Sequence, residues 1–130
     1  MTELSPSNGA SAPRRVLLAD NSPDLAEVLG ELIRMEPALE FLGHVRTGAE
    51  AFEKVQGEAV DVLVLDLGLE DCNGLEVLER LDQAGSKARV IVHTGYASNE
   101  LAAHAKRLGA AAFVVKNGDI EALLTAIHTV

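Results

Sequence analysis

The chain has few of the residues that would support a disulfide framework or a membrane anchor. Cys72 is its only cysteine, so no intramolecular disulfide can form, and a reducing compartment is expected. No stretch approaches the run of about 18 apolar residues that marks a membrane-spanning helix. The N-terminus also lacks the apolar segment of a signal peptide. We therefore expect a soluble cytoplasmic protein in which Cys72 is a loop residue without chemistry.

Basic residues are also scarce. The chain carries 20 acidic residues against 11 lysines and arginines, a net charge of −9. Binding to a nucleic-acid backbone or to an anionic membrane needs clustered positive charge, so we expect neither partner. Apolar residues make up 48% of the 130 positions, which is enough to bury the core of one domain.

The domain organisation follows from composition. Residues 1–13 are rich in Ser, Pro, Gly, Ala and Asn, which predicts a disordered leader. The single domain then occupies residues 14–130.

Five short apolar runs alternate with five segments of helical periodicity. The expected strands are 16–19, 39–45, 60–65, 90–92 and 111–115, and the expected helices follow them at about 22–35, 47–57, 73–85, 98–109 and 119–130. An unbroken βα series predicts an α/β fold with a parallel sheet, right-handed crossovers and helices on both faces. The expected architecture is a doubly wound, flavodoxin-like (βα)5 sheet with strand order 2-1-3-4-5.

Capping residues mark several helix starts. Ser22 precedes a proline at the first helical position, and Ser98 precedes the fourth helix. Thr47 with Glu50, and Asn73 with the glutamate at position 76, have the spacing of capping boxes.

Polar side chains follow four of the strands at the point where each strand ends. They are Asp20, Asp66, Thr94 and Lys116. In open α/β sheets, ligands bind outside the carboxyl ends of the strands, at the point where strand order reverses. Here that point lies between the first and third strands, which end in the two aspartates.

These residue types suit phosphoryl transfer. Two neighbouring carboxylates repel unless a cation lies between them, and Mg²⁺ (or Mn²⁺) with oxygen ligands would resolve the repulsion. The backbone carbonyl of Gly68 is a further candidate ligand. Lys116 and Thr94 could hold phosphate oxygens while Asp66 acts as the nucleophile.

With these residues at its strand ends, the sequence resembles the receiver domains of two-component response regulators, over about residues 15–130. The matching segments are Val16-Leu17-Leu18-Ala19-Asp20, Val62-Leu63-Val64-Leu65-Asp66-Leu67, Asn73-Gly74, Val90-Ile91-Val92-His93-Thr94-Gly95-Tyr96 and Ala112-Phe113-Val114-Val115-Lys116. The resemblance implies that Asp66 is the phosphoacceptor and that Asp20, Asp66 and the Gly68 carbonyl bind the metal. It also implies that Thr94 and Lys116 hold the phosphoryl group and that Phe113 is an aromatic switch.

Several positions depart from the family pattern. The family usually has two adjacent acids after the first strand, but the first of them is Ala19 here, so we expect weaker Mg²⁺ binding. Glu70 stands where the family usually has proline. Asn117 replaces a proline that often follows the lysine, which leaves open whether the peptide bond beside Lys116 is cis.

Two groups of residues have simpler interpretations. An aromatic residue on a strand is more often part of the core than a switch, and this remains the alternative for Phe113. The four histidines, at positions 44, 93, 104 and 128, fall on different elements without ligand spacing, so we expect surface or core placement and not metal binding.

The expected function is that of a phosphoacceptor signalling domain and not of a turnover enzyme. The donor would be a sensor histidine kinase or a histidine phosphotransfer protein. Phosphorylation would change the surface of the fourth helix, fifth strand and fifth helix. A downstream protein, or a DNA-binding effector domain outside this chain, would bind that surface. The domain would act as a monomer or as a dimer through that surface, either as a single-domain regulator or as part of a longer one.

Three other functions share features with this sequence pattern. A flavin-binding flavodoxin needs a phosphate-cradling loop after the first strand, and the two acids in 20–24 would repel a phosphate. An aspartate-nucleophile phosphatase generally has a second acid two residues after its nucleophile, where Asp66 has Gly68. A degenerate receiver that binds partners without phosphorylation draws its support from Ala19.

Overall fold

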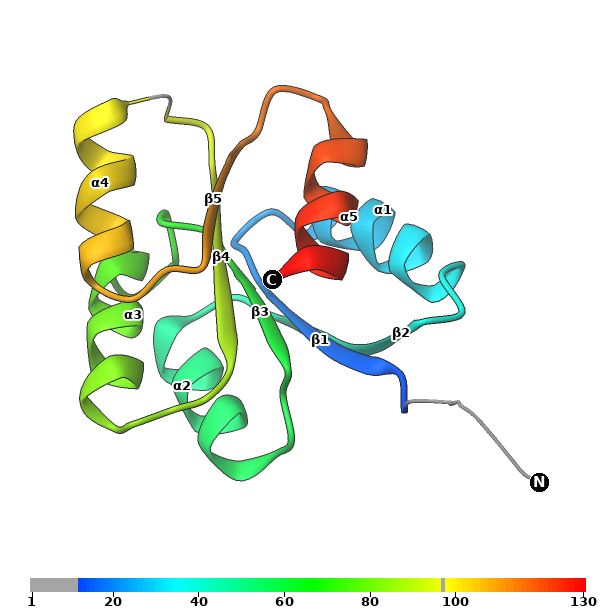
Figure 1. The fold of residues 1–130 in the computed structure, drawn as a ribbon, viewed down its shortest axis with the longest axis horizontal. Coiled ribbons are helices and arrows are strands. Elements are labelled where there is room, and N and C mark those ends of the chain that lie inside the picture. The colour runs from blue at the N-terminus through cyan, green and yellow to red at the C-terminus, as the bar shows by residue number, and fades with distance from the viewer. Residues whose placement is uncertain (1–11, 97) are drawn as a thin grey trace.

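The computed structural model describes residues 12–96 and 98–130. Strands and helices alternate along these residues without interruption (Figure 1). The strands are β1 (Arg14–Ala19), β2 (Leu39–Val45), β3 (Val62–Leu65), β4 (Arg89–Thr94) and β5 (Ala112–Val115), and the helices are α1 (Pro23–Arg34), α2 (Gly48–Gly57), α3 (Gly74–Gln83), α4 (Asn99–Arg107) and α5 (Ile120–Thr129). The predicted leader falls largely on residues 1–11, which lie outside the described residues.

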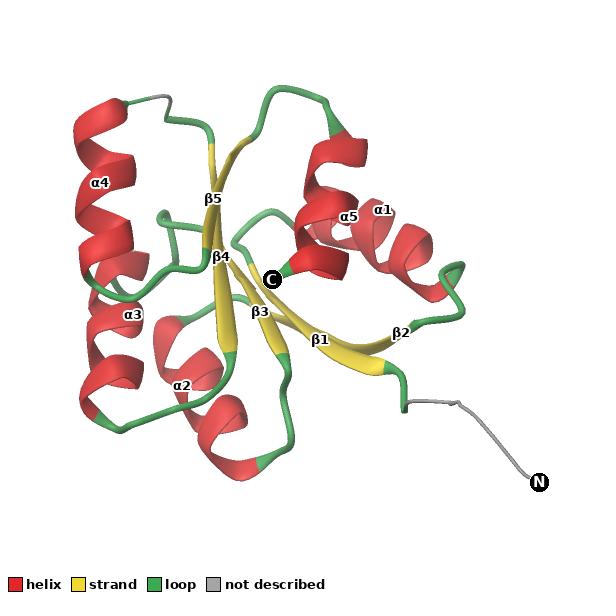
Figure 2. Cartoon of the chain, in the orientation of Figure 1, coloured by secondary structure: helices red, strands yellow, loops and turns green. Residues whose placement is uncertain are grey.

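All five strands form one parallel sheet in the order β2-β1-β3-β4-β5. This confirms the predicted fold class and strand order. Figure 2 shows the sheet between two helical layers, with α2, α3 and α4 on one face and α1 and α5 on the other. The reversal of strand order lies between β1 and β3, so the loops that follow these two strands open at the same edge of the sheet.

Each face of the sheet has its own apolar core. On β3, Leu63 and Leu65 belong to the core under α2, α3 and α4, whereas Val62 and Val64 belong to the core under α1 and α5. All four side chains are at most 3% exposed. Because β3 is buried on both faces, its sequence is a continuous apolar run and not an alternating one. Burial of each such side chain contributes about 1.5–3 kcal/mol.

Most of the predicted helix caps are present. The hydroxyls of Ser22 and Ser98 accept hydrogen bonds from the amides three residues later. Asn73 and Glu76 form a complete capping box at the start of α3. These caps satisfy amide groups that have no partner within the helix.

The capping box predicted at Thr47 is only half formed. The Thr47 hydroxyl accepts a bond from the Glu50 amide at 3.1 Å, but the Glu50 carboxylate bonds the same hydroxyl at 3.0 Å and not the Thr47 amide. The remaining amides at the start of α2 are bound from another loop. Asp71 accepts from Gly48 N–H at 2.6 Å and from Ala49 N–H at 3.1 Å. These bonds lower the pKa of Asp71, because they favour its charged form.

Four of the five strands differ in their bounds from the prediction. Strand β4 is longer than expected at both ends and runs over Arg89–Thr94. Strand β1 begins at Arg14, because this residue pairs with Leu39 and its guanidinium donates to carbonyls at the end of α5. Strand β3 begins only at Val62, because the Val60 amide bonds the Glu58 carbonyl within a turn. Strand β5 is one residue shorter at its start and begins at Ala112.

Helix α4 packs only shallowly on the sheet. Ala105 is its one buried residue, while Leu101, Ala102 and Leu108 are partly exposed. Leu75 of α3 is likewise only partly buried. The cause at α4 is its position over β5, an edge strand whose residues are themselves all partly exposed.

None of the described helices is long and apolar enough to cross a membrane.

Candidate functional site

The two carboxylates lie side by side at the carboxyl edge of the sheet. Asp20 directly follows β1 and Asp66 directly follows β3, and these strands are hydrogen-bonded neighbours. The Asp66 amide donates to the Ala19 carbonyl at 2.8 Å, which extends the ladder to the site itself. Asp20 is 5% exposed and Asp66 is 8% exposed. Removing two carboxylates from water at one place is costly unless a positive charge compensates them.

Lys116 supplies that charge. Its ammonium nitrogen lies 2.8 Å from Asp20 Oδ2 and 3.1 Å from Asp66 Oδ2. Lys116 follows β5, the edge strand two positions away from β3 in the sheet, so its long side chain reaches across β4. The structure thus brings together three of the residues that the sequence singled out, from three separate strands.

The second oxygen of each carboxylate is held by a backbone amide. Asp20 Oδ1 accepts from Ser22 N–H at 2.8 Å, and Asp66 Oδ1 accepts from Gly68 N–H at 3.2 Å. Both are local turns in which an aspartate binds the amide two residues later. Each aspartate is therefore fixed by its own loop through one oxygen and by Lys116 through the other.

Thr94 ends β4 at the same edge and is 4% exposed. Its hydroxyl accepts from the amide of Tyr96 at 3.3 Å, and its carbonyl accepts from the amide of Lys116 at 2.6 Å. The side chain of Tyr96 points largely into solvent, with 74% of the residue exposed. The Thr94 hydroxyl is therefore bonded to its own loop in this structure and not to the carboxylates.

Phe113 lies on β5 opposite Val92 and is half-buried. It packs against the core under α2, α3 and α4, which is the face opposite the one that carries α1 and α5. This placement is compatible with both interpretations given above, a core residue and a switch.

His93 lies in the core beside the site, which is one of the two placements expected for the histidines, but its closeness to the site was not predicted. Ile91 faces α1 and α5 and Val92 faces the other core, so alternation places His93 on the α1 side. It is 4% exposed, and its Nδ1 has no hydrogen-bond partner among the described residues. Burial lowers the pKa of His93, and the nearby charge of Lys116 lowers it further. The alternation of residues along β4 was the sequence signal that could have placed His93 on the α1 side of the sheet.

The donor set fits a hard divalent cation with few protein ligands. Among the residues described, no group of three or more His, Cys, Asp or Glu side chains could hold a metal. The oxygens of Asp20 and Asp66 do converge, however, because one ammonium nitrogen contacts both. Mg²⁺ is typically bound by one or two carboxylates and retains several waters. The converging carboxylates of Asp20 and Asp66 therefore supply the kind of ligand that Mg²⁺ requires.

Two departures from the family pattern have clear structural consequences. Glu70, in place of proline, pairs with Arg46 at 2.7 Å, and its amide bonds the Arg46 carbonyl at 3.2 Å, which ties the loop after β3 to the loop after β2. None of the described peptide bonds is cis, so the bond between Lys116 and Asn117 is trans.

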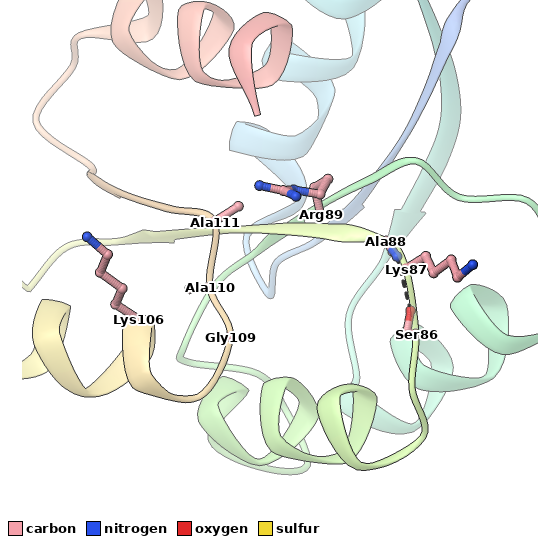
Figure 3. Close-up of a pocket in the computed structure, with 8 residues that line it drawn as sticks. All are labelled: Ser86, Lys87, Ala88, Arg89, Lys106, Gly109, Ala110 and Ala111. Carbon is pink, nitrogen blue, oxygen red and sulfur yellow. Dashed lines mark hydrogen bonds between the residues drawn. The ribbon is translucent and has the colours of Figure 1, made fainter.

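A basic hollow lies where strands β4 and β5 begin, at the end of the sheet opposite the carboxylate site (Figure 3). It is lined by Lys87, which precedes β4, by Arg89 at the start of β4, by Lys106 of α4, and by the segment 109–111 that leads into β5. Because the strands are parallel, their starts lie far from the edge at which Asp20 and Asp66 are found. The hollow contains none of the site residues and is not part of the carboxylate site.

Comparison with known proteins identifies the family. The response regulator receiver domain family matches residues 16–128. The nitrate/nitrite response regulator protein NarL of Escherichia coli K12 is 30% identical over 116 residues, which cover 89% of this chain and 54% of NarL. A protein-glutamate methylesterase/protein-glutamine glutaminase of Myxococcus xanthus is 37% identical over 106 residues, 81% of this chain and 30% of that protein. The chain thus spans about half or less of the curated relatives it matches.

Solved structures agree in fold. The receiver domain of a putative Luxo repressor protein from Vibrio parahaemolyticus superposes with a TM-score of 0.83 at 30% identity, covering 89% of this chain and 88% of that one. A response regulator from Burkholderia pseudomallei, solved with a phosphorylated aspartic acid, calcium ion and citrate, gives a TM-score of 0.79 at 26% identity, covering 89% and 67%. On the strength of the family match and this shared fold, the chain belongs to the receiver domains of two-component response regulators.

Proposed function

We propose that Asp66 is the phosphoacceptor of this receiver domain. The observation that carries the proposal is the buried pair of Asp20 and Asp66 with one ammonium nitrogen between them, at the end of the strand pair where the sheet order reverses. The phosphorylated aspartic acid in the Burkholderia pseudomallei relative supports the same chemistry here. The donor would be the phosphohistidine of a sensor kinase or of a histidine phosphotransfer protein.

In the transfer, a carboxylate oxygen of Asp66 attacks the phosphorus atom. The new bond is an acyl phosphate O–P bond, the bond that breaks is the P–N bond of the phosphohistidine, and the imidazole leaves with the bonding electron pair. The Lys116 ammonium nitrogen lies 3.1 Å from Asp66 Oδ2, so it would contact one phosphoryl oxygen and offset the negative charge of that oxygen. The Thr94 hydroxyl, held by the Tyr96 amide before transfer, would turn to bind a second phosphoryl oxygen.

Asp20, Asp66 and the Gly68 carbonyl would hold Mg²⁺ or Mn²⁺. When bound, the cation supplies positive charge that offsets the negative charge of the attacking carboxylate and the phosphoryl oxygens. The Burkholderia pseudomallei relative was solved with a calcium ion, which supports the binding of a divalent cation by this fold. Because Ala19 removes one carboxylate, we infer an affinity for Mg²⁺ lower than that of receivers with two adjacent acids.

The output would be a change of the surface formed by α4, β5 and α5. This surface suits a switch because α4 buries only Ala105 and every residue of β5 is partly exposed, so few contacts oppose a rearrangement. Movement of Thr94 toward the phosphoryl group would leave room for Phe113 to turn inward. A downstream protein, or an effector domain outside this chain, would read the change only as far as it binds the two states differently.

The test is phosphorylation by a small-molecule donor such as phosphoramidate, whose P–N bond resembles that of phosphohistidine. Intact mass spectrometry should show a gain of one phosphoryl group that requires Mg²⁺ and is absent in Asp66→Asn. Asp82→Asn makes the same charge change at an exposed position of α3 and should leave the gain intact. No gain in the wild type at saturating Mg²⁺ would contradict the proposal and favour a phosphorylation-independent binding module.

A further inference from the structure

Asp20 is the only acid where β1 ends, because Ala19 stands where the family pattern has a second acid. All four of its polar groups are engaged. Its amide donates to the Val45 carbonyl at 3.0 Å, and its two carboxylate oxygens bind the Ser22 amide and Lys116. The fourth group is its carbonyl oxygen, and the partner of that oxygen is a side chain.

That partner is His44 of β2. Its Nε2 lies 2.6 Å from the Asp20 carbonyl oxygen. Because a carbonyl can only accept, the imidazole must carry its hydrogen on Nε2 and donate. The imidazole ring is partly buried. It bonds the backbone of the candidate metal ligand and not the carboxylate itself.

A break in the strand register turns His44 toward this carbonyl. Val16 pairs with Phe41 but Leu17 pairs with Gly43, so Leu42 is an extra residue in β2. Gly43 has a φ of +121°, in the region that favours glycine. Leu42 and Val45 consequently contact the same core although they are three residues apart.

This shift of parity decides where His44 lies. Without the extra residue, strict alternation from Leu42 would place His44 on the face of α2, α3 and α4. With it, His44 lies on the α1 side, where it lines a groove with Pro23 and Asp24 of α1. The bulge therefore points the imidazole at the loop that carries Asp20.

We propose that His44 is a positioning residue that holds Asp20 in place for the divalent cation. The proposal rests on the function proposed above, and it assigns His44 a role in metal affinity and none as a ligand. With one carboxylate fewer than its relatives in the family pattern, the site depends more on the fixed placement of Asp20. Loss of the donor should therefore weaken the binding of Mg²⁺ while the nucleophile stays intact.

The experiment compares the wild type with His44→Leu, His44→Gln and the matched control His128→Leu. Leucine keeps much of the volume but cannot donate, whereas the glutamine amide places a donor at about the distance of Nε2. His128 bonds Glu36 at 2.8 Å on the same face of the sheet, so its loss removes a histidine contact away from the site. Mg²⁺ affinity is measured by two-dimensional amide NMR, following the Gly68 and Asp66 signals.

We expect Mg²⁺ affinity to fall roughly three- to tenfold in His44→Leu, the effect of one net hydrogen bond. His44→Gln should return to within about twofold of the wild type, and His128→Leu should match it. With phosphoramidate, His44→Leu should be slow at low Mg²⁺ and reach the wild-type rate at saturating Mg²⁺. A general loss of structure would not be overcome by the cation.

Equal Mg²⁺ affinity in the wild type and His44→Leu would overturn the inference and leave the proposed function standing. Equal weakening in His44→Leu and His44→Gln would also overturn it, because donation would then not matter. Absence of Mg²⁺ binding by the wild type would instead overturn the proposed function. If His44→Leu does not fold, the ¹⁵N shifts of the wild-type imidazole decide: the Nε2–H tautomer supports the bond, and the Nδ1–H tautomer refutes it.

Discussion

Replacement of Gly74 by alanine should disturb the loop that carries Asp66. Gly74 opens α3, and its amide donates to the Leu67 carbonyl at 2.8 Å. A Cβ at this position would collide with the carbonyl oxygen of Asp66 and would lie 2.9 Å from Leu67 Cα. Ordinary contact begins at 3.4 Å, so the backbone would have to shift by about 0.5 Å at Leu67 and by more at the Asp66 carbonyl.

The cost of such overpacking is about 1–3 kcal/mol in the free energy of unfolding. The obstacle is backbone and not the end of a flexible side chain, so relief by a rotamer change is not available. Because the displaced atoms belong to Asp66 and Leu67, Gly74→Ala should also lower the extent of phosphorylation by phosphoramidate. Urea unfolding measures the first effect and intact mass spectrometry the second.

Gly57→Ala is the matched control. Gly57 is the last residue of α2, and a Cβ there would have no atom within 4 Å. Its unfolding free energy should stay within about 0.5 kcal/mol of the wild type or rise by up to about 1 kcal/mol, because alanine restricts the unfolded chain. A Gly74→Ala protein as stable and as readily phosphorylated as the wild type would refute the packing argument.

Three further predictions concern the charges of the site and the cysteine. Lys116→Met removes the ammonium group that Asp20 and Asp66 share. The unfolding free energy measured in EDTA should fall by about 1–3 kcal/mol, and Mg²⁺ should restore part of the loss. An unchanged urea midpoint would contradict this prediction. Burial lowers the pKa of His93, so the folded state binds fewer protons than the unfolded chain. The free energy of unfolding should therefore be highest above about pH 6.5 and fall as the pH drops toward about 5. The fall should be less steep in His93→Leu, and parallel pH profiles for the two proteins would contradict this prediction. Burial and the charge of Asp71 raise the pKa of Cys72, so iodoacetamide should label it more slowly than a free thiol at pH 7, and equal rates would show otherwise.

The fold was predictable because the apolar runs, the helical periodicity and the helix caps all indicated the same alternation of strands and helices. The buried run Val62–Leu65 and the helical periodicity between strands allowed one topology, and the structure has it. The caps at Ser22, Asn73 and Ser98 were also predictable, since they depend only on neighbours in the chain. The convergence of Asp20, Asp66 and Lys116 followed from topology alone, because parallel strands end at one edge.

What could not be predicted depends on contacts between distant segments. The cap that Asp71 provides for α2 joins loops 22 or more residues apart, and no local pattern marks it. Likewise, the turn of His44 toward Asp20 depends on a bulge whose register is set by pairing with β1. The shallow packing of α4 follows from the exposure of an edge strand and not from its own periodicity.

The most direct test of the central claim is to locate the phosphoryl group within the chain. After treatment with phosphoramidate and Mg²⁺, borohydride reduces an aspartyl phosphate to homoserine, which marks the acceptor. Tryptic cleavage after Lys54 and Arg80 releases one peptide, 55–80, that contains Asp61, Asp66 and Asp71. Fragment masses that place homoserine at Asp66 alone are the predicted result. Homoserine at Asp61 or Asp71, or at no position of this peptide while the protein gains a phosphoryl group, would contradict the account.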